Sequence, residues 1–150
     1  MRKRSVLPVI LLLALVLCAC GGKSYFSADD VDMLLDAGVF GDSDMEELDD
    51  DILLMLYGID EATVLKCDGY LAANTSVSAD EVALFIMKDE EAAEAAVEAC
   101  RKRLNAQLDM CRTYCPDAVP RLEHAYLRRL DNTVLLAVGD SAFITELMKG

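Results

Sequence analysis

Residues 81–115, EVALFIMKDEEAAEAAVEACRKRLNAQLDMCRTYC, decide the fold, because they place a strand directly before a long helix. The segment 81–88 is apolar and follows the turn-rich residues 74–80, which predicts a strand. Acidic residues then stand at the positive end of the helix dipole. Pro116 ends the helix near Cys115. The expected buried stripe of this helix advances in steps of three and four residues through Ala93, Val97, Cys100, Leu104, Leu108 and Cys111.

Two hairpins are expected around this helix. The expected strands are 63–71, 81–88, 125–130 and 133–138, and a short helix is expected over 141–149. Alternation in the first strand places Leu65, Cys67 and Leu71 on one face. The turn Asp131-Asn132 joins the last two strands.

Two further helices are expected at the N-terminal end. The first begins after Ser27 and ends at Gly38, with Val31, Leu34 and Leu35 at helical spacing. The second is expected over 44–57, and its apolar stripe consists of Met45, Leu48, Ile52, Leu53 and Leu56.

The acidic run Asp42–Asp51 has a second interpretation, as a calcium-binding loop. Such a loop needs a glycine at its sharp turn, and Glu47 stands in that place. Because Met45 and Leu48 are interleaved with the acids at helical spacing, we expect the carboxylates to form the solvated face of a helix.

The expected fold is therefore an α+β domain. Two N-terminal helices precede two ββα units, and the four strands form a mainly antiparallel sheet with helices packed on one face.

The first residues, MRKRSVLPVILLLALVLCACGG, have the pattern of an export signal. A basic head precedes an apolar run that is shorter than the about 20 residues needed to span a bilayer. Leu17-Cys18-Ala19-Cys20 resembles the lipobox of bacterial lipoproteins, which implies cleavage before Cys20 and a diacylglyceryl group on its sulfur. The alternatives are a plain secretory signal or an uncleaved membrane tether, and Cys18 fits the lipobox less well because bulkier residues precede it. The expected organisation is a signal peptide over 1–19, a lipidated tether over 20–28 and a single domain over 29–150.

Charge is distributed unevenly along the chain. The 150 residues include 14 basic and 27 acidic residues, and residues 20–99 hold 3 basic and 21 acidic residues. An acidic domain is repelled by phosphate backbones, so we expect no nucleic-acid binding. A partner with a basic face, or a cation, is the better electrostatic match; the alternative is that the charge serves solubility.

Short motifs along the chain resemble one family. The motifs are Leu56-Tyr57-Gly58-Ile59-Asp60, Ser78–Phe85, Lys88–Ala92, Pro120–Ala125 and Asn132–Val138. Together with the lipobox they resemble small bacterial lipoproteins, chiefly of Gram-positive bacteria, with a domain of unknown function of the DUF4358 type. The resemblance implies the order of the fold and the membrane anchor, and it implies no catalytic residues.

Four cysteines besides Cys20 are candidates for chemistry. Their alternatives are a structural disulfide among Cys67, Cys100, Cys111 and Cys115, inert buried thiols, or a metal or redox site. A strand-to-helix bridge from Cys67 to Cys100 or Cys111 is geometrically reasonable, because these residues are expected to face one core. The spacing from Cys111 to Cys115, with His124 nine residues further on, is a weak zinc signal, so no metal is expected.

No motif indicates catalysis. His124 is the single histidine, and a Cys–His nucleophile pair with Cys111 or Cys115 has no protease signature around it. Glycine-rich phosphate loops, nucleophile elbows and metalloprotease motifs are missing from the sequence.

The sequence therefore predicts a lipid-anchored protein on the extracytoplasmic face of the cell membrane. We expect a non-catalytic binding or interaction module with a protein partner and no cofactor. The alternatives are a small cysteine-based metal or redox site, or a solute-binding accessory of a transporter.

Overall fold

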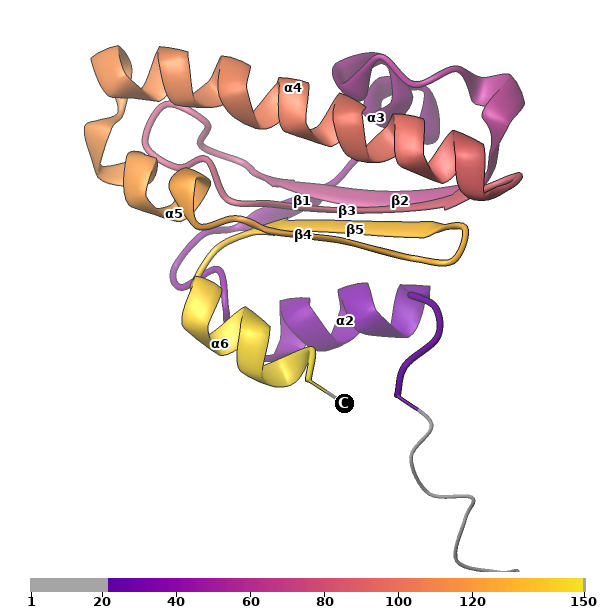
Figure 1. Ribbon diagram of the computed structural model, residues 1–150. Helices are drawn as coiled ribbons and strands as arrows, with labels where there is room; N and C mark the ends of the chain where they lie inside the picture. Colours follow the sequence, from indigo (N-terminus) through magenta and orange to yellow (C-terminus); the bar gives the residue numbers. More distant parts are fainter. Residues whose placement is uncertain (1–21, 150) are drawn as a thin grey trace, which may run out of the picture.

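The computed structural model describes residues 22–149, which fold into three layers with a sheet in the middle (Figure 1). Within those residues the sheet has five strands in the order β1-β2-β3-β5-β4, and every neighbouring pair is antiparallel. The strands are β1 (Met45–Glu47), β2 (Val64–Ala72), β3 (Glu81–Met87), β4 (Tyr126–Leu130) and β5 (Thr133–Val138). The α+β class is confirmed, and the prediction of four strands is wrong.

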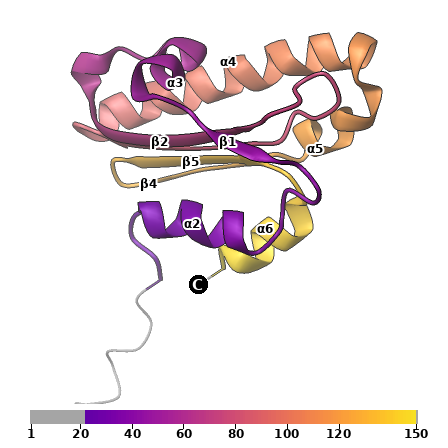
Figure 2. The same cartoon turned by 180° about the vertical axis from the view of Figure 1, so that it is seen from behind.

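Helices cover both faces of the sheet, so the prediction of helices on one face is also wrong. Figures 1 and 2 show α3, α4 and α5 on one side and α2 and α6 on the other. The helices are α2 (Ala28–Asp36), α3 (Asp50–Tyr57), α4 (Glu90–Tyr114), α5 (Val119–Glu123) and α6 (Ser141–Leu147). Two short 3-10 helices add Glu61–Thr63 and Pro116–Ala118. Among the described residues, no helix is long and apolar enough to cross a membrane.

The central strands explain the two covered faces. Ala83, Phe85 and Met87 of β3 pack into the core beneath α4, whereas Val82 and Leu84 pack into the core beneath α2 and α6. All six residues of β5 are buried as well. Unbroken apolar strands of this kind are buried on both faces, and a sheet with helices on one side would leave half of these side chains in water.

The strand and long helix of residues 81–115 are confirmed. Asp89 caps α4 by accepting a hydrogen bond from the backbone N–H of Ala92 at 2.7 Å. Ala93, Cys100 and Cys111 of the expected stripe are buried, and Val97, Leu104 and Leu108 pack against the same core. Pro116 follows the helix end at Cys115.

The expected helix over 44–57 begins only at Asp50. Residues 45–47 instead form the edge strand β1, in which Met45 pairs with Ala72 and Glu47 pairs with Tyr70. Helical spacing of Met45 and Leu48 predicted a helix there, but backbone pairing with β2 overrides this local preference.

One face assignment in β2 is wrong. Cys67 is buried and Leu71 half-buried, as expected, whereas Leu65 is 68% exposed. The register with β3 shifts between Val64 and Lys66, and this irregularity removes Leu65 from the alternation.

The N-terminal predictions fall partly outside the described residues. The signal peptide over 1–19 and the lipid site Cys20 lie among residues 1–21, whose structure is not described. The described chain enters through Lys23, which forms an ion pair with Asp30, and the backbone N–H of Phe26 donates to the Thr133 hydroxyl at 2.8 Å. These contacts fix the start of α2 on the sheet face opposite α4.

Candidate functional site

A cleft opens at the end of the sheet where β2 finishes and β3 begins. Its volume is about 660 Å³, within the range of about 300–1,000 Å³ typical of ligand sites. Its walls come from the segment after α2, the loop between β2 and β3, and the segment around α5. The lining residues are Phe40, Asp42, Ser43, Asp44, Ala72, Ala73, Asn74, Val77, Ser78, Ala79, Asp80, Asp117, Ala118 and Arg121.

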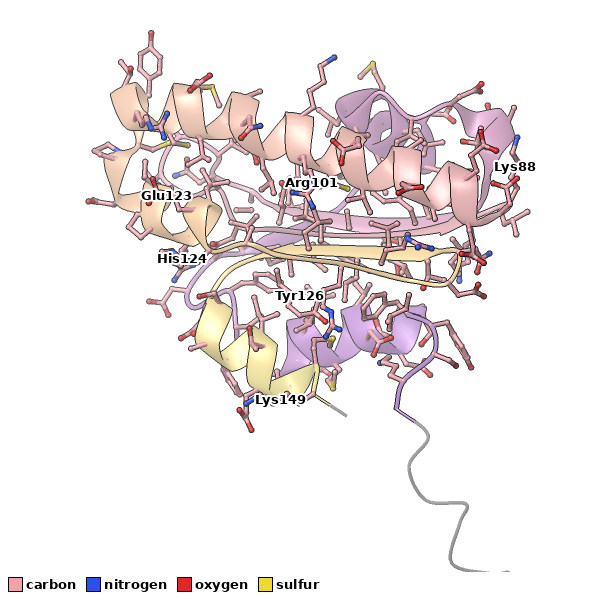
Figure 3. The ribbon with its side chains drawn as sticks, in the orientation of Figure 1. Lys88, Arg101, Glu123, His124, Tyr126 and Lys149 are labelled. Carbon is pink, nitrogen blue, oxygen red and sulfur yellow. The ribbon has the colours of Figure 1, made fainter. Side chains whose placement is uncertain are left out.

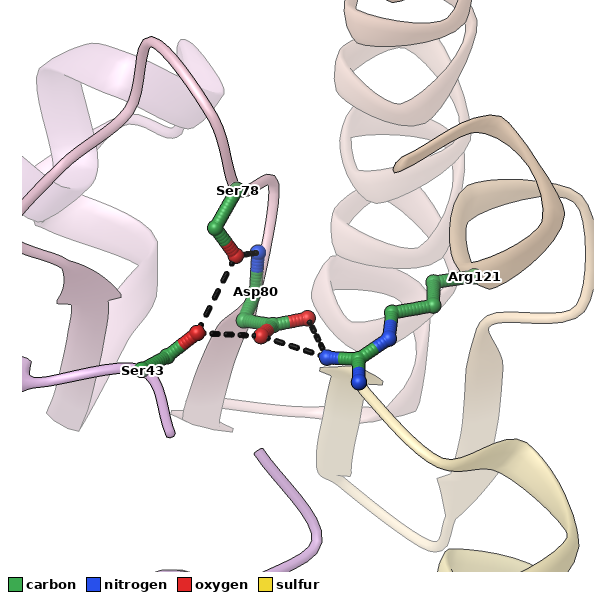
Figure 4. Close-up of polar contacts among 4 residues, drawn as sticks. All are labelled: Ser43, Ser78, Asp80 and Arg121. Carbon is green, nitrogen blue, oxygen red and sulfur yellow. Dashed lines mark hydrogen bonds and ion pairs between the residues drawn. The ribbon is translucent and has the colours of Figure 1, made fainter. Parts of the chain in front are cut away.

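Four of these residues form a polar network centred on Asp80 (Figure 4). Arg121 Nη1 lies 2.6 Å from both carboxylate oxygens of Asp80, and Ser43 Oγ donates to Asp80 Oδ2 at 2.6 Å. Ser78 Oγ lies 3.2 Å from Ser43 Oγ and accepts from the Asp80 backbone N–H at 3.1 Å. The buried Asp80 carboxylate thereby ties together three segments that are distant in sequence.

Local structure places each member of the network. Asp80 immediately precedes β3, and its carbonyl oxygen accepts from the Ala72 N–H at 2.9 Å, which closes the β2–β3 loop. Gly41 has a φ of 63°, in the left-handed region that favours glycine, so the chain can turn and present Ser43. Arg121 lies on α5, which follows α4 after the break at Pro116.

The remaining charges make the cleft negative. Three further carboxylates, those of Asp42, Asp44 and Asp117, line it and are exposed, and none forms an ion pair with a described residue. Arg121 neutralises Asp80 through Nη1. Its Nε and Nη2 donate to no other described group, so part of the guanidinium stays available. The arrangement favours a ligand with positive charge and offers it hydroxyl groups and small apolar walls.

A second carboxylate–arginine pair lies next to the first but inside the molecule. Arg103 of α4 donates to Glu81 Oε2 through Nε at 2.9 Å and through Nη2 at 2.7 Å. The Gln107 amide donates to Glu81 Oε1 at 3.0 Å and accepts from Arg103 Nη2 at 3.3 Å when its O and N are oriented to suit both. The Arg103 guanidinium also lies over the Tyr57 ring, with its Cζ atom 5.0 Å from the ring centroid. Burial raises the pKa of the Glu81 carboxyl above its ordinary value.

The four predicted cysteine positions are all buried, and in the described part of the chain they are free thiols. Burial raises the pKa of Cys67 and of Cys100 to about 12. Burial, followed by contact with the Cys115 thiol, raises the pKa of Cys111 to about 11. A raised pKa suppresses the reactive thiolate. A disulfide among these residues stays a prediction for a thiol count to test.

His124 lies at the surface near the end of α5 (Figure 3). Its Nδ1 lies 2.8 Å from the Pro120 carbonyl oxygen, and in residues 22–149 it forms no hydrogen bond with Cys111 or Cys115. No group of three or more His, Cys, Asp or Glu residues within that range is arranged to hold a metal ion.

The cleft residues Ser43, Ser78, Asp80 and Arg121 were not predicted as a site. Ser78 and Asp80 lie in the turn-rich stretch before a predicted strand and in one of the family-like motifs, and Arg121 lies in another motif, but none of these patterns predicts a site. A polar residue directly before an unbroken apolar strand is the one local signal that marked Asp80.

The comparisons with known proteins give a family and no function. The family model described as a domain of unknown function (DUF4358) matches residues 39–139, a range that includes every residue of both arginine–carboxylate pairs. No curated protein matches the chain, and no solved structure does. Because this family model covers more than half of the chain, the chain belongs to the DUF4358 family.

Proposed function

We propose that this chain is a non-catalytic binding module, held on the extracytoplasmic face of the cell membrane by a lipid on Cys20. In this proposal the module takes a positively charged segment of a protein partner into the cleft. The observation that carries the proposal is the cleft itself, in which a fixed Asp80–Arg121 network stands among three carboxylates without ion-pair partners in the described chain.

The electrostatics of the cleft support a cationic ligand. A Lys or Arg side chain entering it would meet Asp42, Asp44 or Asp117 at the exposed rim. Charge complementarity of this kind raises association rates and selects among partners. The small side chains of Ala73, Ala79 and other lining residues leave room for the backbone of an extended segment.

The hydrogen bonds of the network support a binding role over a catalytic one. Ser43 is the only hydroxyl that donates to Asp80 among the described residues, and both oxygens of that carboxylate already accept from Arg121. Among the described residues, no histidine hydrogen-bonds Ser43 or Asp80, so the network lacks the nucleophile, base and orienting group of an activated serine.

The anchor is supported by the sequence of residues 1–22. Each buried methylene of a lipid chain contributes about 0.8 kcal/mol, and two or more chains give stable attachment. Residues 22–27 lead into α2, on the sheet face opposite α4.

Photocrosslinking in cells tests the proposal. A benzoyl-phenylalanine residue would replace Val77, an exposed residue of the cleft. The matched control carries the same residue at Lys88, which is also exposed and lies at the opposite end of the sheet from His124 (Figure 3). A Cys20→Ala version tests whether the adduct depends on the anchor.

We expect one abundant protein adduct at position 77 and none at position 88. The triple change Asp42→Asn, Asp44→Asn and Asp117→Asn should reduce the adduct, since it removes the unpaired charge. Equal adducts at both positions, or an unchanged adduct in the triple variant, would contradict the proposal. Release of the Cys20→Ala protein from membranes should abolish the adduct.

The volume of the cleft also favours a second candidate, a solute-binding accessory protein, since about 660 Å³ suits a small molecule. The probe for this role is spermidine, a small polycation. A rise in melting temperature with spermidine that the triple Asp→Asn variant lacks, combined with no protein adduct at position 77, would favour the solute over the protein segment.

A further inference from the structure

The outer surface of α3 is apolar where a surface helix is ordinarily polar. Leu53, Leu54 and Tyr57 of this eight-residue helix are buried against the sheet and α4. Its other side carries Ile52, Met55 and Leu56, which are 42, 73 and 36% exposed. These three residues, which we call the α3 outer face, stand at spacings of three and four, so they form one continuous stripe.

After the acidic first turn, Asp50 and Asp51, α3 is apolar on all sides, and a helix surface of this kind is ordinarily buried. A contiguous exposed apolar surface on a soluble domain marks an interaction site. Within the described chain, nothing covers the α3 outer face. The flexible thioether of Met55 suits a surface that adapts to a partner.

The charge around this stripe identifies the kind of partner. Residues 42–61 contain nine acidic residues and no Lys, Arg or His. Among them, Asp49, Asp50, Asp51 and Asp60 are exposed at the two ends of α3. An apolar stripe between carboxylates is complementary to a helix that has one apolar face bordered by Lys or Arg.

We infer that the α3 outer face docks a cationic amphipathic helix of a partner protein. This surface is separate from the cleft. It lies on the α4 side of the sheet, whereas the described chain enters through α2 on the opposite side (Figure 2). The inference therefore does not depend on a ligand in the cleft, and the carboxylates around α3 disfavour an anionic bilayer as the occupant.

The test uses the full chain with Cys20→Ala and a synthetic Leu/Lys amphipathic helix of about 18 residues. The peptide carries one tryptophan, and since the chain has none, the fluorescence of that residue reports binding alone. Two control peptides are a scrambled version without an apolar face and a version with Glu in place of Lys. Vesicles of anionic lipid test the bilayer as an alternative occupant.

We expect the amphipathic Lys peptide to bind at least about tenfold more tightly than either control peptide. The double change Met55→Gln and Leu56→Gln should weaken binding at least about tenfold. Met110→Gln is the matched control, because it makes the same exchange at an exposed methionine of α4, and it should leave binding unchanged.

Two outcomes would overturn the inference. Equal binding of the scrambled peptide, with no loss in the Met55/Leu56 variant, would show only unspecific attraction to acidic charge. Binding of anionic vesicles that depends on Met55 and Leu56 would assign the surface to lipid. The Val77 adduct reports the cleft separately, so failure of one proposal is distinguishable from failure of the other.

Discussion

Asp80 and Glu81 are neighbours in sequence, and each binds an arginine, yet the two pairs differ in their access to water. The side chain of Arg121, the partner of Asp80, is 41% exposed, whereas that of Arg103, the partner of Glu81, is 13% exposed. We call Asp80–Arg121 the open pair and Glu81–Arg103 the sealed pair. One arginine–carboxylate pair therefore lies on the wall of a cleft, and the other lies inside the core.

The supporting elements explain the difference. Arg103 projects from the long helix α4, and Tyr57 and Gln107 contact it from two sides. Arg121 projects from the five-residue helix α5 beside the cleft. The sealed pair serves the fold, because the Glu81 carboxylate has no exposed surface. The open pair can both hold the cleft together and contact a ligand.

The largest effect is expected from breaking the sealed pair. Arg103→Met leaves the Glu81 carboxylate buried without its partner, which lowers the free energy of unfolding by about 3–5 kcal/mol. Urea denaturation followed by circular dichroism measures this loss. Arg101→Met is the control, since Arg101 is exposed and, among residues 22–149, pairs only with Glu98 on the helix surface. A loss no larger than the control's would contradict a structural role for the sealed pair.

A smaller loss is expected from the open pair. Arg121→Met leaves the buried Asp80 carboxylate on the wall of the cleft, where water can enter in place of the guanidinium, and still in contact with the Ser43 hydroxyl. Because Arg121 is partly screened by solvent, we expect a loss of about 1–2 kcal/mol in the same urea experiment. A loss equal to that of Arg103→Met would show that the cleft admits no water to Asp80 when Arg121 is shortened, and the distinction between the open and the sealed pair would fail.

The sequence predicted the fold best where periodicity is strong and partners are close along the chain. The strand of residues 81–87, the helix after it and the hairpin from Tyr126 to Val138 are present as expected. β1 escaped prediction because its three residues, Met45–Glu47, show no alternation and depend on pairing with β2. The second layer of helices had a signal, since β3 and β5 have no polar face, but that signal was interpreted as burial on one side.

The candidate site was much less accessible to sequence reasoning. Arg121 lies 41 residues after Asp80, and Arg103 lies 22 residues after Glu81. No local spacing relates such residues, because the fold alone brings them together. The α3 outer face was not predicted for another reason. The apolar pattern assigned Ile52 and Leu56 to the buried stripe of a longer helix, whereas both residues are exposed on α3.

Removing the hydroxyl that supports the open pair should cost less than removing the arginine. Ser43→Ala deletes the hydrogen bond to Asp80 Oδ2 and leaves Arg121 in place. A hydrogen bond to a charged group at a partly solvated site contributes about 1 kcal/mol, which is the loss we expect by urea denaturation. Ser76→Ala, on the exposed β2–β3 loop, is the control and should change stability less. A Ser43 variant as stable as the control would remove this serine from the network.

The smallest effect is a pH dependence of the stability that the sealed pair contributes. Burial raises the pKa of Glu81 above its ordinary value of 4.5, so the folded chain takes up this proton at a higher pH than the unfolded chain does. Stability contributed by this group is therefore fully present below the unfolded pKa and is lost as pH rises through the folded pKa. Glu81→Gln cannot titrate. The difference in unfolding free energy, wild type minus Glu81→Gln, should fall as pH rises from about 4 to about 7, because the slope follows the protons bound in each state. A difference that rises over this range would mean that the Arg103 guanidinium outweighs burial and holds the Glu81 carboxylate ionised in the folded chain.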